Sequence, residues 1–259
     1  MALTRTTIDP ATFTTLRIVS GAAVLYLLAR TRTRGHSGEG SWLSALALFI
    51  YAAAFSFAYV ALTAGTGALL LFGAVQATMI TVGVVRGERL HVAGIAGLLL
   101  AYTGLIALVL PGLAAPPLTS ALLMLAAGVA WGVYSLRARR AGDPTRVTAG
   151  NFARAIPMAL LVSAFAWPAH SLDVTGAVCA IASGAIASGV GYAIWYTALR
   201  SLAATTAATV QLSVPVLAAV GGVLLLSEPL TIRLFASGAA ILGGVALVLV
   251  TAARRQAVE

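Results

Sequence analysis

Nine long apolar runs set the strongest limit on what this chain can fold into. The runs cover about residues 10–30, 42–62, 66–85, 90–110, 118–137, 148–168, 174–199, 203–226 and 231–251. As a helix, each run is long enough to cross the ~30 Å hydrocarbon core of a bilayer. A helix also satisfies its own backbone hydrogen bonds, which lipid cannot do. We therefore predict an all-α integral membrane protein with nine transmembrane helices present.

The composition excludes a soluble protein. Hydrophobic residues make up 60% of the chain and charged residues 9%, which is too little charge to cover the surface of a soluble domain. The net charge of +9 comes from arginine alone, because the sequence contains no lysine. These arginines lie in short loops between apolar runs, so we predict no nucleic-acid partner. The single cysteine, Cys179, lies within an apolar run, and we predict no disulfide, metal site or cofactor.

The arginines also predict which side of the membrane each loop faces. Those that follow the odd-numbered runs are Arg30, Arg32, Arg34, Arg86, Arg89, Arg137, Arg139, Arg140, Arg146, Arg200, Arg254 and Arg255. The opposite side holds only Arg5 and Arg233. Because cytoplasmic loops are enriched in arginine and lysine, we predict a cytoplasmic C-terminus. The expected location is the bacterial inner membrane, with multiple passes.

The second half of the chain repeats the first. Ala61-Leu62 recurs 137 positions later as Ala198-Leu199, and Arg17 recurs at the same spacing as Arg154. Internal repeats of hydrophobic helices are common in secondary transporters. With five helices in each half, an odd number, the two repeats would have opposite orientations in the membrane.

The repeat also sets the predicted domain boundaries. We place the first repeat at residues 1–111, the second at 117–251 and a cytoplasmic tail at 252–259. The run at 118–137 has no counterpart, because a position 137 residues earlier would precede Met1. We therefore expect ten helices in the complete arrangement, with the first helix of repeat 1 missing from this sequence.

Short motifs occur in the same order in both repeats. The first set is Tyr59-Val-Ala-Leu-Thr63, Gly87-Glu88-Arg-Leu90, Gly97 and Gly104. The second set is Trp195-Tyr-Thr-Ala-Leu199, Pro215-Val-Leu217, Ser227-Glu228-Pro-Leu230 and Gly243-Gly244, preceded by Ala130-Trp131-Gly-Val-Tyr134. This order and spacing, over nearly the whole chain, resembles the EamA-type transporters of the drug/metabolite transporter superfamily.

The resemblance implies a secondary-active transporter that moves small metabolites or amino acids, usually outward, through a central cavity. Two departures from the family pattern concern that cavity. The second repeat has Pro215 thirteen residues before its Glu228, whereas the first repeat has Val75 at the corresponding position. The other departure is the absence of the first helix of repeat 1, which would form one wall of the cavity.

Two arginines are the leading candidates for binding a substrate. Arg17 and Arg154 are the only charged residues well inside apolar runs, where a charge costs several kcal/mol unless it is paired. Either residue could attract a carboxylate or phosphate on the substrate. The alternative is a structural arginine that binds helix-end carbonyls or extends to a headgroup. Asn151 shares a helical face with Arg154 and joins the candidates.

Polar and aromatic residues within the runs complete the predicted cavity. The polar candidates are Gln76, Gln211, Ser213 and Pro215, which would line a wet cavity or bond and kink neighbouring helices. The aromatic candidates are Trp131, Tyr192 and Trp195, with Ser188 on the same face as the last two. Aromatic residues of this kind also serve as anchors at the membrane interface.

Two acidic residues lie at the ends of equivalent runs, and we favour a structural role for them over proton coupling. These are Glu88 and Glu228. Enzymatic activity is not expected, because no metalloprotease motif, intramembrane carboxylate pair or phosphate-binding loop is present.

The sequence therefore predicts a transporter that works by alternating access, with anionic or zwitterionic substrates favoured. The alternatives are a multidrug or cation exporter, or a degenerate membrane component that transports nothing. The expected partners are a small-molecule substrate and the lipid bilayer, and self-association into a homo-oligomer is left open.

Overall fold

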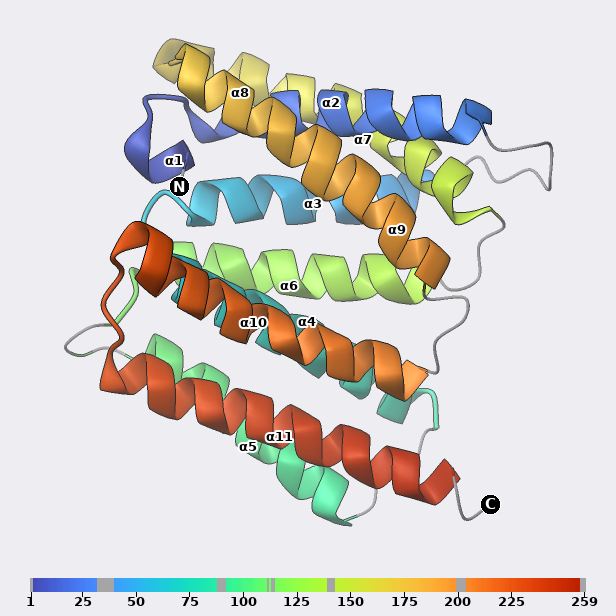
Figure 1. The fold of residues 1–259 in the computed structure, drawn as a ribbon, viewed down its shortest axis with the longest axis vertical. Coiled ribbons are helices and arrows are strands. Elements are labelled where there is room, and N and C mark those ends of the chain that lie inside the picture. The colour runs from blue at the N-terminus through green and yellow to red at the C-terminus, as the bar shows by residue number, and fades with distance from the viewer. Residues whose placement is uncertain are drawn as a thin grey trace. The chain divides into compact units, whose positions relative to one another are not determined.

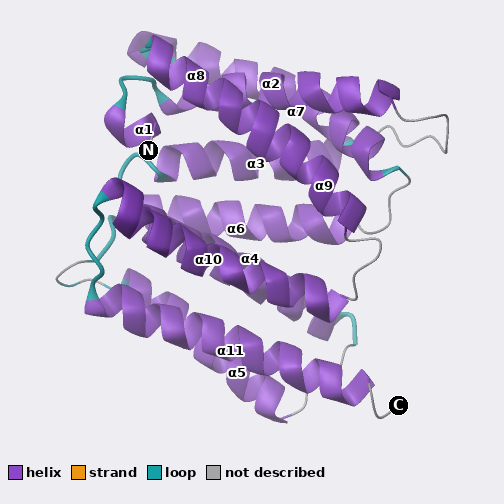
Figure 2. Ribbon diagram, in the orientation of Figure 1, coloured by secondary structure: helices purple, strands orange, loops and turns teal. Residues whose placement is uncertain are grey.

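The computed structural model is helical throughout the residues that it describes. These are residues 2–31, 40–87, 92–110, 112, 115–138, 143–198 and 204–256. Figure 2 shows helices joined by loops in this part of the chain, with no strand among the described residues. The predicted loop positions Arg32, Arg34, Glu88, Arg89, Arg139, Arg140 and Arg200 lie outside the described residues, as do residues 257–259 of the predicted tail.

Nine long helices follow a short N-terminal helix, α1 (Ala2–Arg5), within the described ranges. They are α2 (Pro10–Thr31), α3 (Trp42–Ala58), α4 (Ala64–Val85), α5 (Val92–Val109), α6 (Leu118–Ala138), α7 (Pro144–Phe165), a continuous helix over Val174–Ala198, α10 (Ala204–Leu226) and α11 (Ile232–Gln256). The continuous helix consists of α8 (Val174–Ala182), the π-helical segment η2 (Ser183–Val190) and α9 (Gly191–Ala198). A 3-10 turn, η1 (Trp167–Ala169), precedes it.

Seven of these helices are long and apolar enough to cross a membrane by length and composition. Two others are shorter on this measure, namely α3 with 17 residues and the described apolar part of α10, Ser213–Leu226. Each of the nine predicted runs therefore corresponds to a helix, and the prediction of an all-helical membrane protein is confirmed.

Aspartate-proline pairs begin two of the helices. Asp9 accepts a hydrogen bond from the Thr12 N–H at 2.9 Å, and Asp143 accepts one from the Arg146 N–H at 3.0 Å. Each aspartate caps N–H groups that the helix leaves unpaired, and the proline that follows has no N–H to satisfy. Because of this cap, α7 begins at Pro144, whereas the hydrophobic run predicted a start near residue 148.

The chain forms two compact units, and each combines helices from both halves of the sequence. Unit 1 contains Met1–Val60 and Val133–Ser201, and unit 2 contains Ala61–Gly132 and Leu202–Glu259. Unit 1 thus holds α2, α3, α7 and the α8 to α9 helix, while unit 2 holds α4, α5, α10, α11 and most of α6. The predicted repeats are divisions of the sequence, and the compact units cut across them.

In unit 1, α2 packs along α7 and along the α8 to α9 helix (Figure 1). The Thr15 hydroxyl donates to the Ala159 carbonyl at 3.1 Å, and Gly21 faces the ring of Phe152. Later residues of α2 contact earlier residues of α7, so these two helices are antiparallel.

In unit 2, the most extensive packing joins α5 to α11 (Figure 1). Gly97 faces Leu247 and the Gly244 carbonyl, while Gly104 faces Ile241. Later residues of α5 contact earlier residues of α11, so α5 and α11 are antiparallel. Small residues at this interface let the two backbones approach closely.

The helices α4 and α10 form a second antiparallel pair in unit 2. Gly65, near the start of α4, faces Ala219, and Gln76 further along α4 contacts Gln211, which is earlier in α10. On its other side α4 packs against α6, where Gly128 lies against the α4 backbone. Each of the pairs α2 with α7, α5 with α11 and α4 with α10 thus joins a helix from the first half of the sequence to one from the second half.

Candidate functional site

Arg17 is the most unusual polar residue that the structure describes in unit 1. It lies within α2, and only 6% of its surface is exposed. Its Nε donates to the Ser188 hydroxyl at 3.3 Å, and its Nη2 donates to the Tyr51 hydroxyl at 3.1 Å. The guanidinium carbon lies 5.4 Å from the ring centre of Tyr51 and 4.9 Å from that of Phe55. These rings give the cation partial electrostatic compensation.

No described carboxylate neutralises Arg17. Among the described residues, no ion pair involves this arginine. The Nη1 atom of Arg17 is buried and has no hydrogen-bond partner among the described residues. An intramembrane arginine costs about 3 kcal/mol or more, and an unsatisfied buried donor adds about 1–3 kcal/mol. The environment therefore leaves this cation able to bind an anionic group.

The π-helical segment η2 brings Ser188 to Arg17. Ser188 is 1% exposed, and two positions nearby in this segment are glycines. A side chain at Gly184 would collide with the Arg17 carbonyl and the Ser20 hydroxyl, so α2 can pack here only against glycine. Single π turns inside α-helices often occur at functional sites.

Sequence reasoning missed Tyr51 and Phe55 as contributors to this site. Their signal was an aromatic stripe with four-residue spacing, formed by Tyr51 and Phe55 on α3 and by Tyr59 directly after it. The neighbouring rings are in contact, with centres 5.7 Å and 4.6 Å apart. Such a stripe lies on one helical face, but spacing alone does not show what that face contacts.

The predicted aromatic residues fall in different environments. Tyr192 is half-buried beside the Arg17 site, interacts electrostatically with the guanidinium, and packs edge-on against Phe152 with ring centres 5.8 Å apart. Trp195 is also half-buried on α9. Trp131 is 8% exposed and belongs to unit 2.

The two candidates on α7 have local roles in the structure. Asn151 is 2% exposed, and its Oδ1 accepts the Ser41 N–H at 2.8 Å at the start of α3. Its Nδ2 lies 3.4 Å from the Tyr134 hydroxyl. Arg154 is half-buried, and its Nη1 donates at 3.1 Å to the Gly150 carbonyl of its own helix. Asn151 therefore contacts the N-cap residue of α3, and Arg154 makes the helix-carbonyl contact expected of a structural arginine.

The remaining polar candidates lie in unit 2. Gln76 is 3% exposed, and its Nε2 reaches the Oε1 of half-buried Gln211 at 3.5 Å, the outer limit of a hydrogen bond. Ser213 is exposed, and Pro215 is buried within α10. The glutamine pair joins α4 to α10 within unit 2.

Acidic residues at helix N-termini are engaged by backbone donors. Both carboxylate oxygens of Glu228 lie 2.9 Å from the Ala64 N–H at the start of α4. A carboxylate is stabilised there by the helix dipole, which favours the structural interpretation of this residue.

Asp9 is held ionised at the start of α2. Burial disfavours its charged form, but hydrogen bonds from Thr12, Ser171 and His170 together outweigh burial and lower the pKa of Asp9 below its ordinary value of 3.8. The Nδ1 of His170 lies 3.5 Å from the Asp9 carboxylate. On the neighbouring helix, the Gly176 N–H is the main cause of a lowered pKa for the Asp173 carboxyl.

Comparison with known proteins decides the family. The family model for the EamA-like transporter family matches residues 118–250, which is just over half of the chain. The chain belongs to the EamA-like transporter family. It is therefore a membrane transporter rather than an enzyme, and the predicted resemblance is confirmed.

Two individual proteins are similar to this chain over nearly its whole length. This EamA-family chain is 54% identical over 259 residues to "Uncharacterized protein PA1977" of Pseudomonas aeruginosa, covering all of this chain and 90% of that protein. Its fold is similar to that of a protein of known crystal structure, with a TM-score of 0.67 and 22% identity, covering 95% of this chain and 90% of the other. The protein is thus a multi-pass membrane protein with a bacterial homologue.

Proposed function

We propose that this protein exports small anionic or zwitterionic metabolites, such as amino acids or organic acids, by alternating access. The observation that carries the proposal is Arg17, a buried guanidinium with no described carboxylate partner and one nitrogen without a hydrogen-bond partner among the described residues. A substrate carboxylate at this nitrogen would neutralise the cation and satisfy its remaining donor.

The residues around Arg17 suit a small ligand with one charged end. Ser188 and Tyr51 hold two edges of the guanidinium, which fixes its plane. The rings of Tyr51, Phe55 and Phe152 supply apolar surface in the same unit. A fixed guanidinium beside aromatic rings favours a planar carboxylate that carries an apolar or zwitterionic remainder.

The pairing of equivalent helices supports an inverted repeat. The pairs α2 with α7, α4 with α10 and α5 with α11 each join helices that the sequence repeat makes equivalent, and each pair is antiparallel. A two-fold axis in the membrane plane produces this relation, and alternating access uses it to open one site to either side in turn.

We further propose that the protein lies in the bacterial inner membrane with its C-terminus in the cytoplasm. The support is the concentration of arginine in alternate loops. Outward transport is proposed from the family resemblance, and the proposed partners are the substrate and the lipid bilayer.

A thermal-stability screen tests the substrate class. Purified protein is heated with amino acids, organic acids and lipophilic cations, each over a concentration series. A ligand at a hundredfold its Kd should add about 2.7 kcal/mol to the stability of the folded state. Stabilisation by carboxylates supports the proposal, whereas stabilisation by cations alone would support the multidrug alternative. No response to any class would favour a component that does not transport.

A pair of arginine variants tests the site itself. R17Q removes the charge while leaving hydrogen-bonding capacity, and R154Q is the matched control on the equivalent helix. Loss of a charge-assisted hydrogen bond costs about 1.5–3 kcal/mol, so R17Q should weaken carboxylate binding about 10- to 150-fold. R154Q should leave the Kd unchanged, because Arg154 contacts its own helix. Equal Kd values for the two variants would show that Arg17 is not the anion site.

A further inference from the structure

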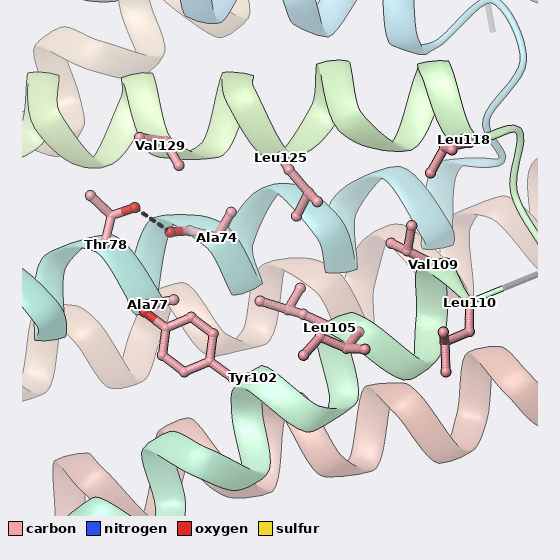
Figure 3. A pocket seen from close by; sticks show the side chains of 11 residues that line it. Ala74, Ala77, Thr78, Tyr102, Leu105, Val109, Leu110, Leu118, Leu125 and Val129 are labelled. Carbon is pink, nitrogen blue, oxygen red and sulfur yellow. Dashed lines mark hydrogen bonds between the residues drawn. The ribbon is translucent and has the colours of Figure 1, made fainter.

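A groove of about 540 Å³ lies among α4, α5 and α6, wholly within unit 2 (Figure 3). Figure 3 shows α4 between the other two helices, with side chains of all three directed into the groove. The lining residues are Ala74, Ala77, Thr78, Tyr102, Leu105, Ile106, Val109, Leu110, Leu118, Leu125 and Val129. Nothing in the proposed transport mechanism uses this groove.

The groove offers no unsatisfied polar group to a ligand. Its two hydroxyl side chains are already bonded, since Thr78 donates to the Ala74 carbonyl at 2.7 Å and Tyr102 lies 2.7 Å from the Thr81 hydroxyl. The other lining side chains are aliphatic. A polar metabolite would lose its hydration here without replacement, whereas a hydrocarbon chain would lose nothing.

The groove opens along the membrane-spanning surface. Ile106, Leu110 and Leu118 are 60%, 54% and 59% exposed, and they lie in or beside two helices that qualify as membrane spans. Exposed aliphatic side chains on a helix that spans the membrane face the acyl chains of the bilayer. Because Leu110 follows the end of α5 and Leu118 begins α6, one end of the groove lies at the membrane interface.

A cation lies at that same end. Arg233, near the start of α11, donates from its Nη1 to the carbonyl of Leu110, a lining residue. Arg233 is half-buried, and no carboxylate pairs with it in the described part of the chain. An apolar groove that ends at a guanidinium with no described carboxylate partner matches one kind of amphiphile, with a long hydrocarbon chain and an anionic headgroup.

We propose that this groove binds an anionic phospholipid, with an acyl chain among α4, α5 and α6 and the phosphate at Arg233. The complementarity of charge at the groove end distinguishes this occupant from a second copy of the chain, which would need no cation there. The site is separate from Arg17 and independent of the transported substrate.

Lipid binding to delipidated protein in detergent tests the headgroup contact. Dioleoyl phosphatidylglycerol and dioleoyl phosphatidylcholine have the same chains and differ in net charge, and native mass spectrometry measures the binding of each. One arginine near a membrane surface contributes about 1 kcal/mol to anionic lipid binding, so phosphatidylglycerol should bind about fivefold more tightly. R233Q should abolish that preference, and R233K should keep most of it. R5Q is the control arginine.

A second pair of variants tests the acyl site. V129F should fill part of the groove and weaken binding of both lipids about tenfold, equivalent to losing contact with about two methylene groups. L122F is the control, because Leu122 lies on the same helix and is 54% exposed but does not line the groove. The proposal is overturned if the wild type binds both lipids equally, if V129F matches L122F, or if V129F instead breaks a dimer.

Discussion

Adjacent glycines on α11 allow a sharp test of how closely the α5 and α11 backbones pack. A Cβ atom at Gly244 would meet the Gly97 carbonyl and would lie 2.7 Å from the Ala101 nitrogen, whereas one at Gly243 would have no neighbour within 4 Å. G244A and G243A make the same chemical change one residue apart. G244A should therefore be less stable than G243A.

The expected size follows from two terms. Replacing glycine by alanine inside a helix favours folding by up to about 1 kcal/mol in both variants. Only G244A also forces the two backbones apart, and overpacking of this kind costs about 1–3 kcal/mol. G243A should therefore be neutral or slightly stabilising, and the difference in unfolding free energy between the variants isolates the collision at about 1–3 kcal/mol.

The assay is unfolding in mixed micelles by titration with sodium dodecyl sulfate, followed by circular dichroism or tryptophan fluorescence. Each variant is compared with wild type at one protein and lipid concentration. If the two variants unfold within about 0.5 kcal/mol of each other, which is the usual scatter for a neutral surface change, the close approach of α5 and α11 is wrong.

Three other perturbations follow from local geometry. D9N keeps the helix cap but removes the negative charge. Because folding lowers the pKa of Asp9 below 3.8, the charged aspartate stabilises the folded protein above pH 3.8, and this stabilisation is lost as the pH falls through the folded pKa. A series of thermal-stability measurements should therefore show the advantage of the wild type over D9N shrinking below about pH 4. Ser227 has a φ of 55° at the end of α10, so S227G should raise stability by about 1 kcal/mol, and a measured loss would contradict this conformation. A double-mutant cycle with Q76L and Q211L should give a coupling of about 0.6 kcal/mol, because their 3.5 Å contact is weak, and a coupling above about 2 kcal/mol would indicate a stronger shared network.

The helices were predictable because long apolar runs carry a strong signal, and all nine appear near their predicted positions. Boundaries were less predictable, since they depend on capping. Asp143 extends α7 toward the N-terminus, while α3 ends at Ala58 rather than near residue 62 because Tyr59 begins a turn. The capping residues are visible in the sequence, but the helix boundaries were predicted from the lengths of the apolar runs instead.

The candidate site was predictable in residue type but not in environment. Arg17 and Arg154 lie 137 positions apart in similar apolar runs, and nothing in those runs indicates that one contacts aromatic rings and the other its own helix. The partners of Arg17 are 34 and 171 residues away, at Tyr51 and Ser188. Ser188 reaches Arg17 from a π-helical segment, and hydrophobic periodicity does not predict that change of helical pitch.

Unit 1 combines helices from both halves of the sequence, and this affects how the protein is inserted into the membrane during synthesis. Its first helices, α2 and α3, pack mainly on α7 and on the α8 to α9 helix, which the ribosome synthesises much later. At about 5–20 residues per second, α2 must wait on the order of ten seconds in the membrane before its partners arrive. Throughout that interval Arg17 has neither Ser188 nor α7 beside it. Retention of α2 by the insertion machinery until α7 emerges would protect this charge from lipid. The order of synthesis therefore limits where in a sequence an intramembrane arginine can be placed.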